Sequence, residues 1–256
     1  MGQSQTSIRK PPSSKAIIKS KMELAAKTGV LNLSDCNLKA SSHVYTFLWE
    51  LAPVIKTLDL SGNTMKVLPN QMELFTSLKS LHLSRCYIQR SRDMSSLPEL
   101  QTLKFDSNDF ESDSLAPLPT SLLRLDLGSN HCKVFPLLAL DNCTLLVELK
   151  LNKNRIENLE GISVLVALET LVLDDNKLTG LCEEVGLLPK LRLLNVRRNL
   201  IAKTDPEQED NQSIHPSVFT DTNLINIDLE GNVLSLADAQ GMDGVEVFMK
   251  RRKKAK

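Results

Sequence analysis

Residues 78–88 read LKSLHLSRCYI, with leucine or isoleucine at the first, fourth, sixth and eleventh positions. The Leu-x-Leu pattern at 81–83 is typical of a short strand whose two leucines point inward and whose middle residue, His82, points outward, because side chains alternate along a strand. One such strand followed by a turn cannot bury its leucines alone. The pattern therefore predicts further copies elsewhere in the chain.

The spacing L-x-x-L-x-L-x-x-N/C-x-L recurs nine times along the 256 residues, counting close variants. The copies occupy residues 28–38, 55–65, 78–88, 100–110, 122–132, 146–156, 168–178, 191–201 and 224–234. This pattern resembles the leucine-rich repeat superfamily over roughly residues 28–236. The resemblance implies an α/β fold: a solenoid shaped as a curved horseshoe, with about nine repeats, a parallel concave sheet and helical caps at both ends.

The ninth position of each copy holds Asn or Cys. An inward amide there can bond backbone groups that the turn leaves without partners, which would otherwise be costly to bury. We therefore expect a structural ladder through the solenoid, in which the two cysteines are small substitutes for Asn. Its members are Cys36, Asn63, Cys86, Asn108, Asn130, Asn154, Asn176, Asn199 and Asn232.

The repeats divide the chain into segments. We expect a flexible basic tail at 1–12, a cap helix at 13–29, the repeat domain at 30–236 with an acidic insertion at 203–221, and a cap helix with a basic tail at 237–256. The polar insertion is expected to bulge from the convex side or the edge of the repeat.

Both cap helices are expected from their apolar faces. The first carries Ile18, Met22, Ala25 and Ala26 on one face and is expected to stop at Gly29. In the second, Asp243 is expected to cap a helix that places Val245, Phe248 and Met249 on one face.

The balanced total of 31 basic and 31 acidic residues conceals a segregation of charge. Both ends are basic, which leaves the repeat region acidic. The N-terminal basic residues are Arg9, Lys10, Lys15, Lys19 and Lys21, and the C-terminal ones include Lys250, Arg251, Arg252, Lys253 and Lys254. The C-terminal run allows three interpretations: a favourable helix end, a membrane contact or a nuclear import signal.

No apolar run resembles a signal peptide or a membrane span, which favours an intracellular protein. The five scattered cysteines are interpreted as reduced thiols in structural positions. The sequence has no phosphate-binding glycine motif, and its histidines (His43, His82, His131, His215) are dispersed. We therefore expect no catalytic site, no metal site, no cofactor and no small-molecule substrate.

The outward residues of the strands and turns form the expected partner-binding concave face. They are Asp59, His82, Arg85, Lys104, Asp126, Lys150, Lys153, Asp174, Asp175, Asn195, Arg197, Arg198 and Asp228. Neighbouring repeats should place Lys153, Asp175 and Arg198 in one row of alternating charge. The charges either neutralise one another or recognise a protein with a mixed-charge loop. Their mixed sign argues against nucleic acid, which requires one dominant positive face.

The chain begins MGQSQT, which fits M-G-x-x-x-[ST] and predicts myristoylation of Gly2. One acyl chain binds membranes weakly, so the basic tail would supply the second contact with an anionic surface. The stretches AAKTGVLNLSDCNLK and LEGNVLSLADAQGMDGVEVFMKRRKKAK resemble the two ends of the leucine-rich repeat-containing protein 57 family. That resemblance implies an intracellular, lipid-anchored protein and carries over one functional position, Gly2.

These features predict a non-enzymatic interaction scaffold or adaptor, tethered to the cytoplasmic face of a membrane and bound to an unidentified protein. Two alternatives remain open. NKNRIENLEGISVLVALETLVLDDNKL resembles the repeats of protein phosphatase 1 regulatory subunits, which implies a cytosolic or nuclear regulator. The chain could also be a structural component of a large assembly.

Overall fold

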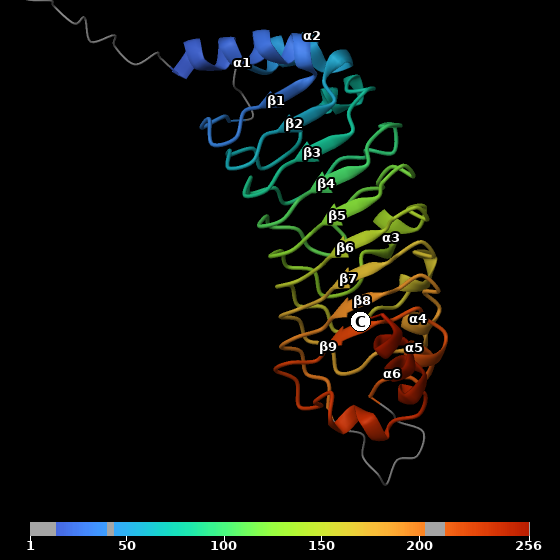
Figure 1. The fold of residues 1–256 in the computed structure, drawn as a ribbon. Helices are drawn as coiled ribbons and strands as arrows, with labels where there is room; N and C mark the ends of the chain where they lie inside the picture. The colour runs from blue at the N-terminus through green and yellow to red at the C-terminus, as the bar shows by residue number, and fades with distance from the viewer. Residues whose placement is uncertain (1–13, 40–43, 203–212, 256) are drawn as a thin grey trace, which may run out of the picture.

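The computed structural model describes residues 14–39, 44–202 and 213–255 (Figure 1). Nine parallel strands stack in chain order into one open sheet, so the chain is a leucine-rich repeat solenoid, as the sequence predicts. Each strand has three residues. They are β1 (Val30–Asn32), β2 (Thr57–Asp59), β3 (Ser80–His82), β4 (Thr102–Lys104), β5 (Arg124–Asp126), β6 (Glu148–Lys150), β7 (Thr170–Val172), β8 (Leu193–Asn195) and β9 (Asn226–Asp228).

The register of the sheet aligns the central leucines of neighbouring strands. Leu31 pairs with Leu58, Leu58 with Leu81, and the series continues to Leu194 and Ile227. Every one of these central residues is buried, with at most 3% of its surface exposed. The flanking residues therefore form the concave face.

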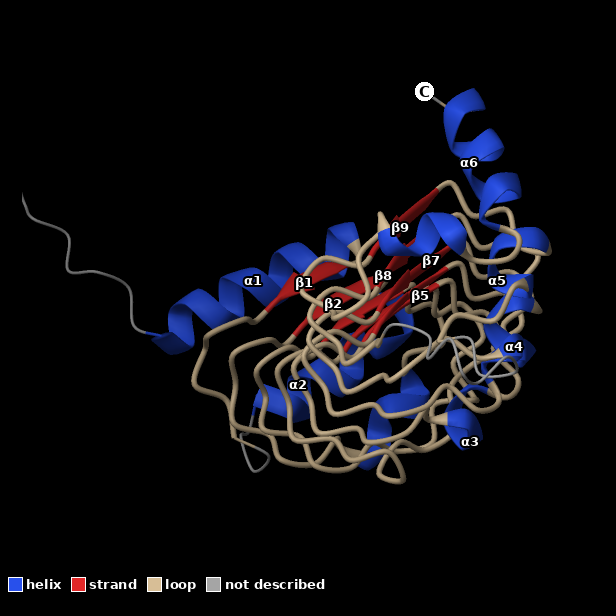
Figure 2. Cartoon of the chain, turned by 90° about the horizontal axis from the view of Figure 1, so that it is seen from below, coloured by secondary structure: helices blue, strands red, loops and turns tan. Residues whose placement is uncertain are grey.

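Short helical segments lie on the return side of the coil, opposite the strands (Figure 2), except for the last, η4 (Asp238–Gly241), which follows β9 and lies beside α6 (Val245–Lys254) at the C-terminal end. The segments are α2 (Val44–Leu51), η1 (Ala52–Val54), η2 (Asn70–Leu74), α3 (Leu137–Leu140), η3 (Ile162–Val164), α4 (Glu183–Gly186), α5 (Ser217–Thr220) and η4 (Asp238–Gly241).

The N-terminal end is covered by α1 (Ser14–Thr28), which stops at Gly29. Gly29 has φ 71° and donates its N–H to Ala25 O at 2.8 Å, the left-handed ending for which glycine is best suited. Met22 and Ala25 are buried, whereas Ala26 is exposed rather than packed into the core.

The C-terminal end is covered by α6 (Val245–Lys254), which buries Val245 and Phe248. The residue at its N-cap is Gly244, with φ 80° and no side-chain cap bond, so the expectation of an Asp243 cap is wrong. A side chain at position 244 would meet Thr220 and Pro216, and glycine lets the helix start close against α5.

The insertion expected at 203–221 requires a second correction. Residues 203–212 lie outside the described residues, but 213–221 do not bulge from the surface. Ile214, Val218 and Phe219 are fully buried, and the Phe219 ring lies 5.9 Å from that of Phe248. This part of the segment is therefore a normal return turn, because its apolar residues fill the core under the C-terminal cap.

The ladder residues satisfy backbone groups inside the turns. Asn154, for example, donates to Leu127 O and Leu151 O at 3.0 Å each and accepts from Cys132 N at 3.0 Å. Asn63, Asn108, Asn130, Asn176, Asn199 and Asn232 make equivalent bonds to the preceding repeat.

The cysteines in the ladder make fewer such bonds. Cys86 Sγ donates to Leu60 O at 3.3 Å. Cys86 has no amide oxygen to accept from Met65 N, which donates instead to the backbone O of Cys86 at 3.1 Å. Cys36 Sγ donates to Ser34 O of its own turn at 3.3 Å and accepts a long contact of 4.0 Å from Lys21 Nζ, so among the described residues it bonds no backbone group of another repeat. The ladder is therefore weaker in the N-terminal repeats.

Candidate functional site

The strand ends place a row of polar side chains along the concave face. Asp59, His82, Lys104, Asp126, Lys150, Asn195 and Asp228 are each the last residue of a strand. Several of these groups also hold their own turn, a role that the sequence did not reveal. Asp59 accepts from Ser61 N at 2.9 Å, Asp126 from Gly128 N at 3.0 Å and Asp228 from Glu230 N at 3.1 Å.

A second row consists of the residue that comes immediately before the ladder residue in each of the nine repeats. The backbone of all nine residues is left-handed. The φ angles there lie between 49° and 78°. The row consists of Asp35, Gly62, Arg85, Ser107, Ser129, Lys153, Asp175, Arg198 and Gly231. The glycines and aspartates of this row could have indicated the left-handed turns from the sequence alone, because these residues tolerate positive φ best.

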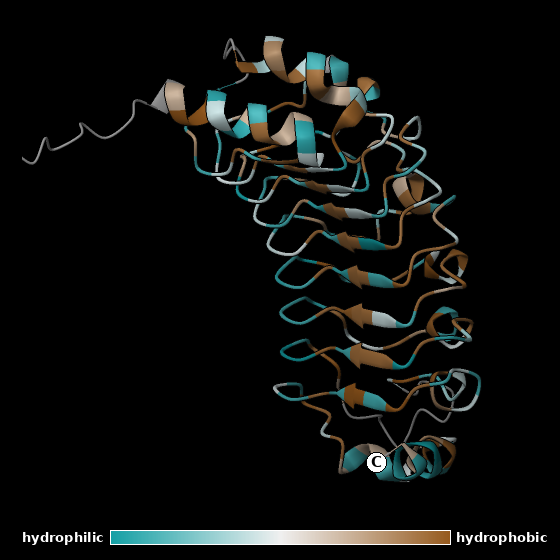
Figure 3. Cartoon of the chain, turned by 45° about the horizontal axis from the view of Figure 1, so that its top comes forward, coloured by the Kyte–Doolittle hydropathy of each residue, from teal (hydrophilic) through white to brown (hydrophobic). Residues whose placement is uncertain are grey.

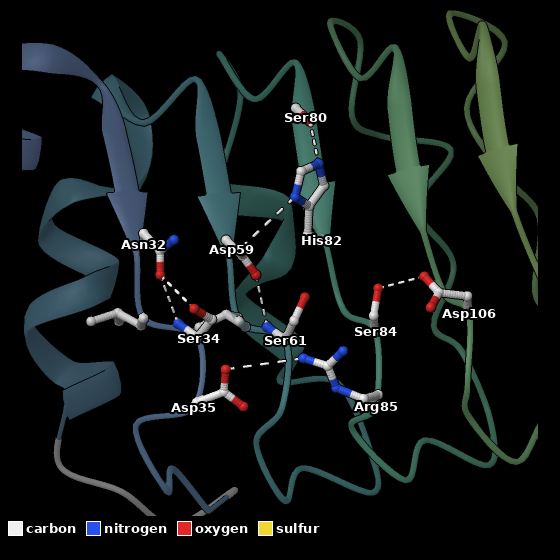
Figure 4. Close-up of polar contacts among 12 residues, drawn as sticks. Asn32, Ser34, Asp35, Asp59, Ser61, Ser80, His82, Ser84, Arg85 and Asp106 are labelled. Atoms are coloured by element: carbon white, nitrogen blue, oxygen red, sulfur yellow. Dashed lines mark hydrogen bonds and ion pairs between the residues drawn. The ribbon is translucent and has the colours of Figure 1, made fainter.

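The N-terminal part of the concave face contains a polar hollow of about 400 Å³, which we call the N-terminal hollow. It extends across β1 to β5, and Figure 4 shows most of its polar groups. It contains four carboxylates, two cations, one histidine and three serines. These are Asp35, Asp59, Asp106, Asp126, Arg85, Lys104, His82, Ser34, Ser61 and Ser84.

In the N-terminal hollow the Arg85–Asp35 ion pair and the contact between His82 and Asp59 are both long, whereas Ser84 Oγ donates a short hydrogen bond of 2.5 Å to Asp106 Oδ1. His82 Nδ1 lies 3.9 Å from Asp59 Oδ2, and Arg85 Nη2 lies 4.0 Å from Asp35 Oδ2 (Figure 4). The Arg85 and Asp35 side chains are 63% and 69% exposed, so their attraction is weak in water. These charges are therefore available to other ligands.

Burial shifts two titrating groups in the N-terminal hollow. It lowers the pKa of His82, helped by the nearby Lys104, so the imidazole is neutral at pH 7. It raises the pKa of Asp126, helped by the neighbouring Asp106 carboxylate. Four carboxylates against two cations thus leave the hollow negative.

The C-terminal part of the concave face has short ion pairs. We call Asp174, Asp175, Arg197, Arg198, Asp228 and Glu230 the C-terminal charge row. Arg198 binds Asp175 through two hydrogen bonds, of 2.5 and 2.7 Å, and these bonds lower the pKa of the Asp175 carboxyl.

Arg197 connects the last two repeats of the same row. Its Nη2 lies 2.5 Å from Glu230 Oε2 and its Nε lies 3.8 Å from Asp228 Oδ2. The backbone N–H of Arg197 donates to Asp174 Oδ1 at 2.8 Å. Both arginines of this row are therefore held in short contacts with carboxylates, although the row, like the hollow, has four carboxylates against two cations.

The predicted basic residues are dispersed rather than brought together. Gly2, Arg9 and Lys10 lie outside the described residues. Lys15, Lys19 and Lys21 belong to α1, at the opposite end of the stack from α6, where Lys250, Arg252, Lys253 and Lys254 lie (Figure 1).

One member of the C-terminal basic run has a structural role. Arg251 donates to Leu224 O at 2.9 Å and to Phe219 O at 2.5 Å, and burial lowers the pKa of its guanidinium. These bonds attach α6 to the last repeat, so this residue is not free to contact a membrane or an import receptor.

Cys86, Cys132 and Cys143 have the surroundings of packed, protonated thiols, whereas Cys182 is exposed. Burial raises the pKa of Cys132 to about 12 and that of Cys143 to about 11. Among the described residues no group of three His, Cys, Asp or Glu side chains is placed to hold a metal ion. In the same ranges no helix is both long and apolar enough to cross a bilayer.

Comparison with known sequences gives one distant relative. No family model matches the chain. The probable serine/threonine-protein kinase pats1 of Dictyostelium discoideum is 30% identical over 200 residues, which are 72% of this chain. The chain spans about 6% of the length of that protein.

Comparison with solved structures identifies the fold. Toll, in the Drosophila Toll–Spatzle complex, matches 82% of this chain and 28% of its own, with a TM-score of 0.64 and 22% identity. TLR13, in a complex with ssRNA13, matches 86% of this chain and 38% of its own, with a TM-score of 0.59 and 19% identity.

The ectodomain of the Arabidopsis thaliana receptor kinase GASSHO1/SCHENGEN3, in a complex with CASPARIAN STRIP INTEGRITY FACTOR 2, matches 77% of this chain and 27% of its own. Its TM-score is 0.53 and its identity 22%. All three matches, together with the nine-strand parallel sheet, place the chain among proteins with the leucine-rich repeat fold.

Proposed function

We propose that the chain is a non-enzymatic scaffold whose concave face binds a protein, and that the N-terminal hollow is the main contact. The observation that carries this proposal is the contrast in ion pairing. Arg85 and Asp35 of the hollow lie 4.0 Å apart, whereas Arg198 and Asp175 meet at 2.5 Å; the short contact that the hollow does contain is the hydrogen bond from Ser84 to Asp106. A partner can bind the loosely paired charges without first breaking strong internal bonds.

The chemistry of the hollow defines the partner surface. Its negative balance and its serine hydroxyls suit a loop that offers a lysine or arginine together with hydrogen-bond groups. The same balance opposes nucleic acid, whose phosphates would meet four carboxylates. Toll with Spatzle, GASSHO1/SCHENGEN3 with its integrity factor and TLR13 with ssRNA13 are solved as complexes, which favours a macromolecular ligand here, and the charge of the hollow favours a protein over a nucleic acid.

The state of the thiols supports a non-catalytic role for the buried cysteines. The thiolate is the nucleophilic form, and burial holds the pKa of Cys86, Cys132 and Cys143 above the ordinary value. The kinase activity named for pats1 belongs to a protein of which this chain matches 6%, so we do not extend it to this chain.

Cross-linking tests the proposed contact surface. A lysine-directed reagent applied to the chain with its co-purified partner is expected to join the partner to Lys104, in the hollow, and not to Lys153, beside the C-terminal charge row. Cross-links at Lys153 without any at Lys104 would contradict the proposal. Recovery of a protein phosphatase 1 catalytic subunit as the partner would favour the regulatory alternative.

We also propose that Gly2 is myristoylated and that the lipid, with Lys19 and the other basic residues near the N-terminus, tethers the scaffold to the cytoplasmic face of a membrane. The support is the MGQSQT sequence and its basic surroundings. Intact mass of the chain purified from its own cells tests this. A myristoyl adduct on Gly2 is expected, and an unmodified or acetylated N-terminus would overturn it.

A further inference from the structure

An apolar groove lies between α1 and α2, at the end of the molecule opposite α6. Figure 3 shows the two helices side by side with hydrophobic residues on both. The groove has a volume of about 660 Å³, and six of the nine residues that line it are apolar. The apolar residues are Ile18, Met22, Ala26, Val44, Phe47 and Leu51, and the charged ones are Lys19, Glu23 and Glu50.

The groove arises because each helix presents apolar residues on two sides. Met22 and Ala25 of α1 are buried in the core, as are Tyr45 and Leu48 of α2. Ile18 and Ala26 of α1 and Val44, Phe47 and Leu51 of α2 line the space between the helices, together with one side of Met22. Phe47 stays 60% exposed, a large apolar area for a protein to leave in water.

We propose that this groove binds the acyl chain carried by Gly2 of the same molecule, an inference that rests on the proposed myristoylation. Twelve residues, 2–13, precede Ser14, and an extended chain of that length spans up to about 40 Å. Ile18 and Ala26, which mark the groove along α1, lie about 6 and 18 Å from the start of the helix at 1.5 Å per residue. The N-terminal glycine can therefore reach any point of the groove.

The size and chemistry of the groove fit an acyl chain. Its volume falls within the range of about 300–1,000 Å³ typical of small-molecule sites, and such sites are lined mostly by apolar side chains. Lys19, Glu23 and Glu50 are exposed at the rim, so no charge would be buried under an uncharged hydrocarbon.

Occupation of the groove would make the membrane anchor reversible. A single myristoyl chain binds bilayers only marginally, with an association constant of about 10⁴ M⁻¹, so an internal site for the chain can compete with the membrane. Lys19 lines the groove and is also one of the basic residues proposed to contact the anionic surface. The acyl chain would then be shielded in solution and exposed at the membrane.

Photo-cross-linking of the full chain tests this site. The chain is acylated at Gly2 in vitro with a myristate analogue that carries a photoreactive group at its far end. After irradiation, cross-links are expected at residues of the groove, in the same molecule. Cross-links spread over the repeats, or found between two molecules, would overturn the proposal.

Two matched substitutions in α1 provide a second test of the groove. Ala26→Trp fills the groove at an exposed position, whereas Leu24→Trp adds the same ring at a residue that does not line the groove and is 61% exposed. Ala26→Trp is expected to abolish the groove cross-links and to raise binding of the acylated chain to phosphatidylcholine vesicles several-fold. Leu24→Trp is expected to change neither, and equal effects of the two would contradict the proposal.

Circular dichroism confirms that both variants fold. Because the acyl group is attached in vitro, the cross-links report on the groove whether or not cells modify Gly2. A failure of the groove is therefore distinguishable from a failure of the proposed lipidation.

Discussion

Two parts of the concave face share one backbone geometry but differ in how their charges are paired. In the C-terminal charge row, Arg198 holds Asp175 with two bonds of 2.5 and 2.7 Å. In the N-terminal hollow, Arg85 and Asp35 are 4.0 Å apart and more than 60% exposed. The ladder beneath differs as well, since Cys36 and Cys86 interrupt it in the first three repeats while asparagines continue it from Asn108 onward. The N-terminal repeats are thus less strongly held and have more charge available for a ligand.

The ladder offers the largest expected effect. Asn154→Ala removes the side-chain partner of Cys132 N and one of the two amide donors to each of Leu127 O and Leu151 O, which keep Asn130 and Asn176. One buried unsatisfied N–H and two lost hydrogen bonds should lower the free energy of unfolding by about 3 kcal/mol. Cys86→Ala removes two weak thiol bonds, to Leu60 O and Ser84 O, and should cost about 1 kcal/mol. Urea denaturation measures both, and equal losses would break the contrast between the two parts.

Reversing a charge in the hollow should have the next largest effect, on the affinity for the partner. Asp106→Lys reverses a charge in the hollow and is expected to weaken the partner about 30-fold, or about 2 kcal/mol, because it repels the proposed basic loop. Glu230→Lys, in the C-terminal charge row, should change affinity less than about threefold. Calorimetric titration of the partner distinguishes them. A larger effect at Glu230 would move the contact to the other part of the face.

Deleting an ion pair should have a smaller effect on stability, and only in the C-terminal charge row. Arg197→Met removes contacts with Asp228 and Glu230 and is expected to lower stability by less than about 1 kcal/mol, since the side chain is 35% exposed and screened by solvent. Arg85→Met should leave stability unchanged. Thermal unfolding at low and high salt tests this, with the Arg197 effect shrinking as salt rises.

The smallest expected effect is a difference in pH dependence. Burial raises the pKa of Asp126, so its charged form opposes folding above that pKa. Asp126→Asn should therefore raise stability at pH 7, by about 0.5 kcal/mol, and the advantage should vanish as pH falls through the raised pKa toward 3.8.

Asp175 should show the opposite sign. Hydrogen bonds from Arg198 lower its pKa, so Asp175 contributes stability above pH 3.8 that is lost as pH falls through the lowered value. Asp175→Asn should reduce stability at pH 7 and have no effect at the acidic limit. Unfolding of both variants between pH 2 and 7 checks the two signs together.

The repeated leucines were sufficient to predict the solenoid. Leu81 and its eight counterparts must all be inward for any of them to be buried, so one pattern fixed nine strands and their order. The leucine pattern does not predict the structure of segments in which apolar residues are few. Ile214, Val218 and Phe219 were masked by acidic neighbours, and composition alone assigned them to a surface bulge.

The sequence predicted which residues belong to the candidate site better than it predicted how those residues contact one another. Strand alternation placed His82, Lys104 and Asp126 on one face, because side-chain direction follows from the backbone. The spacing also placed Asp175 beside Arg198, and the two side chains do pair. How tightly a given pair of charges meets depends on side-chain rotamers, which the spacing does not specify. The groove between α1 and α2 was missed for a similar reason, because it depends on how two helices from different segments pack.

The left-handed turn before each ladder residue has a further consequence. A residue with a side chain gives up roughly 1 kcal/mol there relative to glycine, and Arg85, Lys153, Asp175 and Arg198 all occupy such turns. Asp175 and Arg198 regain part of this cost through the hydrogen bonds between them, whereas the Arg85 side chain is 63% exposed and lies 4.0 Å from its nearest carboxylate. Replacing Arg85 with glycine would therefore raise stability while it removes one surface charge, so at this position the protein keeps a charged side chain at the expense of a more stable turn.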